Sequence, residues 1–84
     1  MKRVAIISAI LEKPAEAQNT FNGIVAEYKN IVRGRMGLPF EEEGISVISI
    51  TVMGSVDEIN SLTGKLGKIP HTQVKTSISK KEIE

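Results

Sequence analysis

The sequence predicts an α+β fold in which a four-stranded antiparallel sheet carries two helices on one face. Residues 4–11 and 45–53 are rich in Ile and Val and have the lengths of buried strands. Two amphipathic segments, after the first run and after the second, have the spacing of helices. The segments therefore follow one another as strand, helix, strand, strand, helix, strand, which is a pair of strand–helix–strand units.

The first of these units begins with residues 4–11, an aliphatic run too short for a stable helix. Pro14 suits the first turn of a following helix, where the N–H that proline lacks would be unpaired in any case. Apolar residues then recur at helical spacing as far as Val32, which predicts a helix of about five turns. Gly23 costs about 1 kcal/mol inside this helix relative to Ala, so we expect a close contact there.

Residues 33–44 contain three glycines, one proline and three consecutive glutamates. They are predicted to form the second strand and the hairpin that leads into the third. In this interpretation Gly34 adopts the left-handed conformation that ends the first helix, and Pro39 marks a strand at the edge of the sheet.

The second unit starts from the strand at residues 45–53. Ser55 and Glu58 have the spacing of a capping box, which predicts the start of the second helix, and Gly67 with Pro70 predicts its end. Residues 72–79 alternate between apolar and polar side chains as a fourth strand. We expect the K-K-E-I-E stretch after it to fray.

Right-handed crossovers applied to this order give a ferredoxin-like βαββαβ sandwich, with residues 1–84 as a single domain.

The first and third strands are central in that topology, and both are apolar on both faces. Since two helices cover only one face, a monomer exposes a contiguous apolar patch, for which association of identical chains is the usual remedy. We expect a homodimer or homotetramer formed through the sheet. A curved sheet partly covered by the chain's own end is the alternative. The patch consists of Ile7, Leu11, Ile45, Val47 and Met53, or of the opposite set.

The composition excludes several classes of function. Eleven Lys and Arg against ten Asp and Glu give a net charge of +1, so no strong field attracts nucleic acid or anionic lipid. We expect no specific DNA binding by the isolated chain and no membrane association. The absence of Cys and the single His argue against a metal centre, and the sequence shows no set of catalytic residues and no cofactor motif.

The N-terminus imitates a secretory signal, because M-K-R precedes an apolar run and A-E-A follows at residues 15–17. Glu12 and Lys13 lie inside the would-be cleavage region, and cleavage would remove a strand that the fold requires. We therefore expect a cytoplasmic protein.

The segment R-G-R-M-G supplies the candidate ligand-binding residues Arg33, Gly34, Arg35 and Gly37. Its G-x-x-G spacing is found in loops that bind nucleic-acid phosphates, but those loops join two helices, and this one does not. Two interpretations stay open. Either the segment is structural and its arginines pair with the glutamates at 41–43, or Arg33 and Arg35 share a strand face and hold a small anion between two guanidinium forks.

Three stretches carry a resemblance to a known family. V-R-G-R-M-G-L-P-F, G-I-S-V-I-S-I-T-V and I-N-S-L-T-G-K-L-G-K-I-P followed by V-K-T resemble the small proteins called iron-only hydrogenase system regulators. The resemblance covers nearly the whole chain and implies an ACT-like unit that self-assembles through its sheets. The family is also similar in fold to the nickel-sensing domain of a bacterial repressor. The absence of Cys and the single His argue against metal sensing in this chain. The distinctive matching residues are Arg33, Gly34, Arg35, Gly37, Gly64, Lys65, Leu66 and Gly67.

Two functions follow as expectations. The preferred one is a non-enzymatic regulatory or small-molecule-sensing module, a transcriptional regulator of an iron-only hydrogenase system, with its ligand site at an oligomer interface near residues 33–37. The alternative is a small enzyme of the dimeric ferredoxin-like type, with a substrate cleft between sheet and helices. That alternative requires a convergent acid, base or nucleophile, and the sequence offers only Tyr28, His71 and scattered carboxylates.

Overall fold

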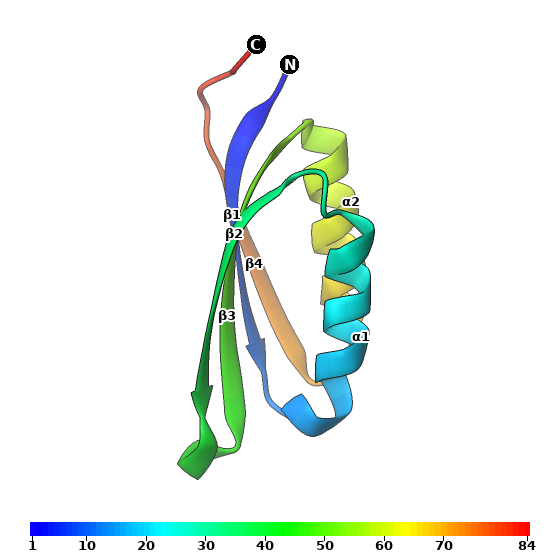
Figure 1. The fold of residues 1–84 in the computed structure, drawn as a ribbon, viewed down its shortest axis with the longest axis vertical. Helices are drawn as coiled ribbons and strands as arrows, with labels where there is room; N and C mark the ends of the chain where they lie inside the picture. Colours follow the sequence, from blue (N-terminus) through cyan, green and yellow to red (C-terminus); the bar gives the residue numbers. More distant parts are fainter.

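A computed structural model describes residues 1–84 and shows one antiparallel sheet with two helices on one side (Figure 1). The strand order is β2-β3-β1-β4, so the first and third strands are central and the ferredoxin-like topology is confirmed. Neither helix is long and apolar enough to cross a membrane. The elements are β1 (Arg3–Leu11), α1 (Pro14–Glu27), β2 (Val32–Phe40), a 3₁₀ turn (Glu41–Glu43), β3 (Ile45–Gly54), α2 (Val56–Gly67) and β4 (Thr72–Ile78).

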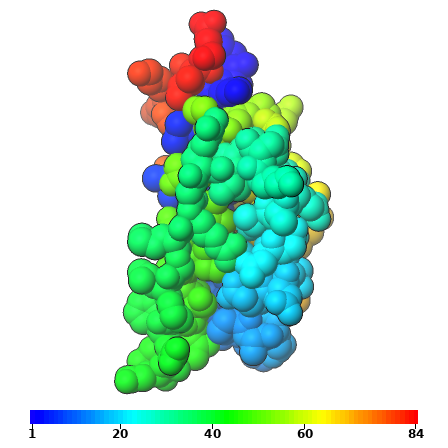
Figure 2. Space-filling model, in the orientation of Figure 1, coloured from blue at the N-terminus to red at the C-terminus, as the bar shows by residue number.

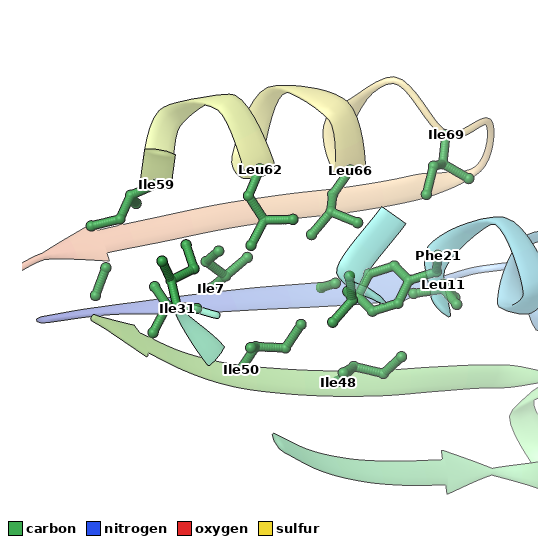
Figure 3. Close-up of a cluster of buried hydrophobic side chains, with 14 of the residues drawn as sticks. Ile7, Leu11, Phe21, Ile31, Ile48, Ile50, Ile59, Leu62, Leu66 and Ile69 are labelled. Atoms are coloured by element: carbon green, nitrogen blue, oxygen red, sulfur yellow. The ribbon is translucent and has the colours of Figure 1, made fainter. Parts of the chain in front are cut away.

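The core lies between the sheet and the helices (Figure 3). Phe21 from α1 and Leu62 and Leu66 from α2 are fully buried against the central strands. β1 contributes alternating small and large side chains, which leave room for helical side chains to interdigitate. The sheet residues on this helix-facing side are Ala5, Ile7, Ala9 and Leu11 from β1 and Ile48, Ile50 and Val52 from β3.

The other side of the sheet, which we call the outer face, is also apolar and is not covered by any part of the chain (Figure 1). Met36, Leu38 and Phe40 are 61%, 51% and 46% exposed, and Ile6 is 47% exposed. The remaining apolar side chains of this face are only partly buried. The apolar residues of the outer face are Val4, Ile6 and Ile10 in β1, Met36, Leu38 and Phe40 in β2, and Ile45, Val47 and Met53 in β3.

The pairing register corrects the predicted composition of this patch. Ile7 lies opposite Ile50 and Leu11 opposite Ser46, and residues directly opposite each other point to the same face. Ile7 and Leu11 are therefore buried under the helices, on the opposite side from Ile45. The end of the chain does not cover the patch either, because it runs beyond the sheet beside the N-terminus (Figure 1).

Helix α1 is shorter than predicted. It ends at Glu27, and residues 28–31 form a turn that returns Ile31 to the core, where it is 3% exposed. The Ile31 carbonyl accepts a hydrogen bond of 2.8 Å from the backbone N–H of Met53. Ile31 thus continues the apolar pattern of the helix without belonging to it. Gly34 does not cap the helix, because it lies within β2 and its φ is not positive.

Two further expectations are wrong. Gly23 is exposed, and a Cβ added there meets no atom within 4 Å, so nothing in the chain packs closely against it. The end of the chain is also held in place, since the backbones of Lys2 and Ile83 exchange hydrogen bonds of 2.8 and 2.7 Å. An ion pair of 3.2 Å between Arg3 and Glu82 adds to this contact.

The predicted capping box is confirmed at the start of α2. The backbone N–H of Ser55 donates to the Glu58 carboxylate at 2.9 Å, and the N–H of Glu58 donates to the Ser55 hydroxyl at 3.1 Å. Gly54 immediately precedes this box. A Cβ at Gly54 would lie 2.9 Å from Cγ2 of Ile31 and 3.0 Å from Oε1 of Glu58, so only glycine fits between β3, the turn and the cap.

These two glycines give a matched pair of variants. We expect Gly54→Ala to lower the free energy of unfolding by about 1–3 kcal/mol, because it forces Ile31 and the cap apart. We expect Gly23→Ala to raise it by up to ~1 kcal/mol, because alanine favours the helix and meets no neighbour. Urea unfolding followed by circular dichroism measures both, and equal effects of the two variants would contradict the packing described for Gly54.

Candidate functional site

The candidate residues lie on β2, a strand at the edge of the sheet. β2 pairs only with β3, so its second edge presents unpaired backbone groups, and Pro39 sits in an edge strand as predicted. The strand lies at the surface along the length of the molecule (Figure 2). Its pairing is irregular between Val32 and Gly34, which places Arg33 in a β-bulge.

Arg35 is directed to the helix side of the sheet. Its Nη2 donates a hydrogen bond of 2.6 Å to Oδ1 of Asn22 in α1, and its guanidinium lies 5.5 Å from the centre of the Phe21 ring. This position agrees with the register, which pairs Arg35 with the buried Ile50. Arg35 therefore joins the edge strand to α1, and one side of its guanidinium is already occupied.

Arg33 is exposed and makes no side-chain hydrogen bond or ion pair within the chain. The expectation that it shares a face with Arg35 relied on regular alternation along the strand, and the bulge interrupts that alternation. The glutamates of the 3₁₀ turn Glu41–Glu43 pair with neither arginine. A single copy of the chain thus leaves one cation and three carboxylates on the same hairpin without partners.

Gly34 and Gly37 lie opposite Thr51 and Ile48, and an added Cβ at either position meets no atom within 4 Å. Close packing inside the chain does not require glycine at these two places. They instead leave the β2 backbone bare on both faces of the strand, so a ligand or a second chain has direct access to it.

The hollows of the surface lie elsewhere. One of about 240 Å³ lies at the start of α2 beside Arg3, and one of about 140 Å³ lies between Glu16 in α1 and Pro70. A third, of about 220 Å³, is lined by Phe40 and the three glutamates of the 3₁₀ turn. None of them includes the segment 33–37, so one copy offers no enclosed pocket at the candidate residues. No group of three or more His, Cys, Asp or Glu side chains is placed to hold a metal ion.

A second polar cluster joins the end of α1 to α2. The hydroxyls of Tyr28 and Ser61 are 2.6 Å apart, and the Lys65 ammonium lies 5.2 Å from the centre of the Tyr28 ring. Lys65 also donates to Glu27 at 3.2 Å. The hydrogen bond from Ser61, and then that from Lys65, lowers the pKa of the Tyr28 phenol, while the Tyr28 contact raises the pKa of Lys65. No cavity adjoins this exposed cluster, so the geometry supports a link between helices.

Sequence reasoning missed this cluster as a unit. Ser61 and Lys65 are four residues apart and so share one face of α2, a signal that the sequence does contain. Their partner Tyr28 is distant along the chain and lies in the turn that was predicted as helix. His71, the single histidine, is exposed with a φ of 57° and makes no side-chain hydrogen bond. Its backbone carbonyl accepts a hydrogen bond of 2.8 Å from the N–H of Glu12.

Tyr28 is the single tyrosine of the chain, so an ultraviolet absorbance titration reports on it alone. We expect its titration midpoint to lie below the value of about 10 found in unstructured peptides, because Ser61 and Lys65 favour the phenolate. Because the folded pKa is lowered, this contribution to stability is fully present only above the unfolded pKa and disappears as the pH falls through the folded one. Ser61→Ala should return the midpoint toward the ordinary value. A midpoint that is unchanged by Ser61→Ala would contradict the cluster.

Comparison with solved structures identifies the fold. The ACT domain from GTP pyrophosphokinase of Chlorobium tepidum superposes with a TM-score of 0.77 at 18% identity, over 92% of this chain and 100% of that one. SnoaB, a cofactor-independent oxygenase from Streptomyces nogalater, superposes with a TM-score of 0.58 at 15% identity, over 100% of this chain and 97% of that one. At these identities the likeness shows the fold alone, which is ACT-like.

The family is more specific. Residues 3–76 match the TM1266-like family, described as "Iron-only hydrogenase system regulator, putative". The uncharacterized protein TM1266 from Thermotoga maritima superposes with a TM-score of 0.90 at 30% identity, over 95% of this chain and 100% of that one. The chain belongs to this family, as the resemblance of its motifs implied. Comparison with curated proteins gives no significant match.

Proposed function

We propose that this protein is a cytoplasmic regulatory module of an iron-only hydrogenase system, which senses a small anionic molecule and acts as a homo-oligomer without being an enzyme. Membership of the regulator family and the ACT-like fold support the regulatory role. The observation that carries the proposal is the position of the unpaired Arg33 on an edge strand, beside an apolar sheet face that nothing in the chain covers.

The outer face supports association. Moving a large apolar side chain from water into an interior is worth ~1.5–3 kcal/mol, and association costs ~4–15 kcal/mol. The four most exposed apolar side chains of this face, Ile6, Met36, Leu38 and Phe40, together offset much of that cost. The other five are partly exposed and add to the gain.

The arginines support an anionic ligand. A guanidinium group presents a fork of donors that matches a carboxylate or phosphate, and Arg33 has no competing partner in its own chain. Since no pocket adjoins it in a single copy, the proposed site is completed by a second copy. We propose that the module exerts its regulatory effect through a partner protein and not by binding DNA itself, because a net charge of +1 gives little nonspecific attraction to DNA.

A small enzyme of the dimeric ferredoxin-like type is the competing proposal. It requires a substrate cleft between the sheet and the helices. That space is filled by one cluster of 15 buried apolar side chains, and the likeness to SnoaB concerns the fold alone. The arrangement therefore favours the regulatory module.

The ligand proposal is tested with a thermal-shift panel of nucleotides, amino acids and carboxylates. We expect at least one anion to raise the melting temperature of the native chain, because a ligand that binds only the folded state stabilises it. Arg33→Gln should abolish that shift while the unliganded chain still folds, since Arg33 makes no contact within its own chain. Lys68→Gln, an exposed cation at the end of α2, serves as the control. A panel without any stabilising anion would refute the site.

The association proposal is tested at Ile6, in the central strand of the outer face. We expect Ile6→Lys to give a folded monomer on size-exclusion chromatography, because the lysine ammonium remains hydrated in a monomer and would be buried without a partner in an interface. Asn19→Lys, on the exposed side of α1, should leave the oligomer intact. If the Ile6→Lys chain keeps the oligomeric state of the native chain, association does not use this face.

A further inference from the structure

The outer face is ordered in rows that cross the strands. The register places Met36, Ser49, Ser8 and Lys75 side by side in β2, β3, β1 and β4, and this row lies at the middle of the face. Its two central members are serines, with larger residues in the rows on either side. The next row toward the 3₁₀ turn contains Leu38, Val47, Ile10 and Gln73, and the row on the other side contains Gly34, Thr51, Ile6 and Ser77.

The columns of the face differ in polarity. The β2 column is apolar, with Met36, Leu38 and Phe40, whereas the β4 column consists of Gln73, Lys75 and Ser77. The apolar patch is therefore displaced toward the β2 edge, and the β4 edge is polar. A second copy that covers the patch has to match this asymmetry.

We propose that two copies stack their outer faces about a two-fold axis that runs across the strands, along the row of Ser8 and Ser49. This inference rests on the proposed homo-oligomer and goes further, since it fixes how the two copies are oriented. Rotation about such an axis reverses the strand direction and keeps each column opposite itself. β2 then packs on β2 of the partner subunit. Met36 faces its own copy at the axis, and Leu38 lies over the partner's Gly34, where no side chain occupies the space.

The other simple two-fold arrangement has its axis parallel to the strands, between β1 and β3. It would place β2 over β4 of the partner subunit, so that Met36, Leu38 and Phe40 would face the polar column. Burying the Lys75 ammonium against these side chains without an acidic partner is unfavourable. The axis across the strands runs along the row that contains Lys75, so the two Lys75 side chains would lie opposite each other at the edge of the interface, where their ammonium groups reach water.

The ends of the face favour the same axis. Ile45 would lie over the partner's Met53 at the other end of β3, and Phe40 would lie over the Arg33 end of β2 of the partner subunit. The 3₁₀ turn Glu41–Glu43 projects past the helices beyond Phe40 and Ile45 (Figure 1). It would approach the far end of the partner's sheet, where the partner's Lys2 and the partner's Arg33 lie.

Charges that are unpaired within one chain would thus become complementary between two. The three glutamates of the turn and Arg33 have no ion pair in a single copy, and the proposed stacking brings the acidic turn of each copy toward the Arg33 end of the other.

The absence of Cys from the sequence allows a direct test by cross-linking of single-cysteine variants. Facing sheets lie ~10 Å apart, further than a disulfide spans, so a short homobifunctional thiol reagent is used. On the proposed axis each serine faces its own copy, so we expect Ser8→Cys alone and Ser49→Cys alone to give a covalent dimer in high yield. Asn19→Cys, on the exposed side of α1, measures cross-linking by random collision.

The alternative axis predicts the opposite pattern, because it places Ser49 over Ser8 of the partner subunit. Cross-linking only when the two variants are mixed would therefore overturn the proposed orientation. The proposed orientation would also be wrong if native chains sediment as dimers but neither variant cross-links above the level of Asn19→Cys. That result would still agree with the proposed homo-oligomer. Sedimentation of the native chain as a monomer alone would overturn both.

The charge pairing is tested separately with Glu42→Gln and Glu43→Gln together. We expect dimer dissociation to become up to about tenfold easier at low salt, as for the loss of one or two exposed ion pairs, with a smaller effect at high salt. Glu16→Gln, a carboxylate on α1, is the matched control. An unchanged dissociation constant at low salt would contradict the approach of the turn to the partner's arginine.

Discussion

A sheet whose central strands are apolar on both faces, with helices enough to cover only one, is the constraint on which the rest of this molecule depends. β1 and β3 supply both the helix-facing core and the middle of the outer face. Burial of the first set is complete within one chain, since Ile7, Leu11 and Ile50 have no exposed surface. Burial of the second set requires another surface, and the side chains that most need it, Met36 and Leu38, lie on the edge strand.

The edge strand also connects this constraint to function. β2 carries the exposed apolar column on one face and Arg35 on the other, where it contacts Asn22 and Phe21. The bulge at Arg33 lies at the end of the strand away from the acidic turn. An event that changes the contacts of β2 would therefore act on the proposed association, on the proposed anion site and on the packing against α1 together. This coupling is what a regulatory module requires.

Sequence patterns were sufficient for the fold because the strongest local signals agree with it. The order of elements, the central position of the first and third strands, and the capping box of Ser55 and Glu58 were all predicted and confirmed. The residues that share the helix-facing side could not be predicted, because both faces are apolar. The pairing of Ile7 with Ile50 in the structure shows that these two share a face, and their burial shows that the helices cover it. The end of α1 was missed because Ile31 continues the helical spacing from a turn that packs on the core.

The site was less predictable than the fold. The segment 33–37 was singled out by its residue types, but the bulge at Arg33 and the engagement of Arg35 by Asn22 depend on tertiary contacts. The spacing of Ser61 and Lys65 shows that these two residues share a face of α2, but their contact with Tyr28 depends on how the turn after α1 packs against α2.

Sedimentation equilibrium of the native chain is the most direct test of the central claim that the outer face is an interface. The chain has a mass of 9.2 kDa, and we expect a species of twice or four times that mass at micromolar concentration. A single species of 9.2 kDa across the micromolar range would contradict it, because the apolar outer face would then be exposed in the working form of the protein.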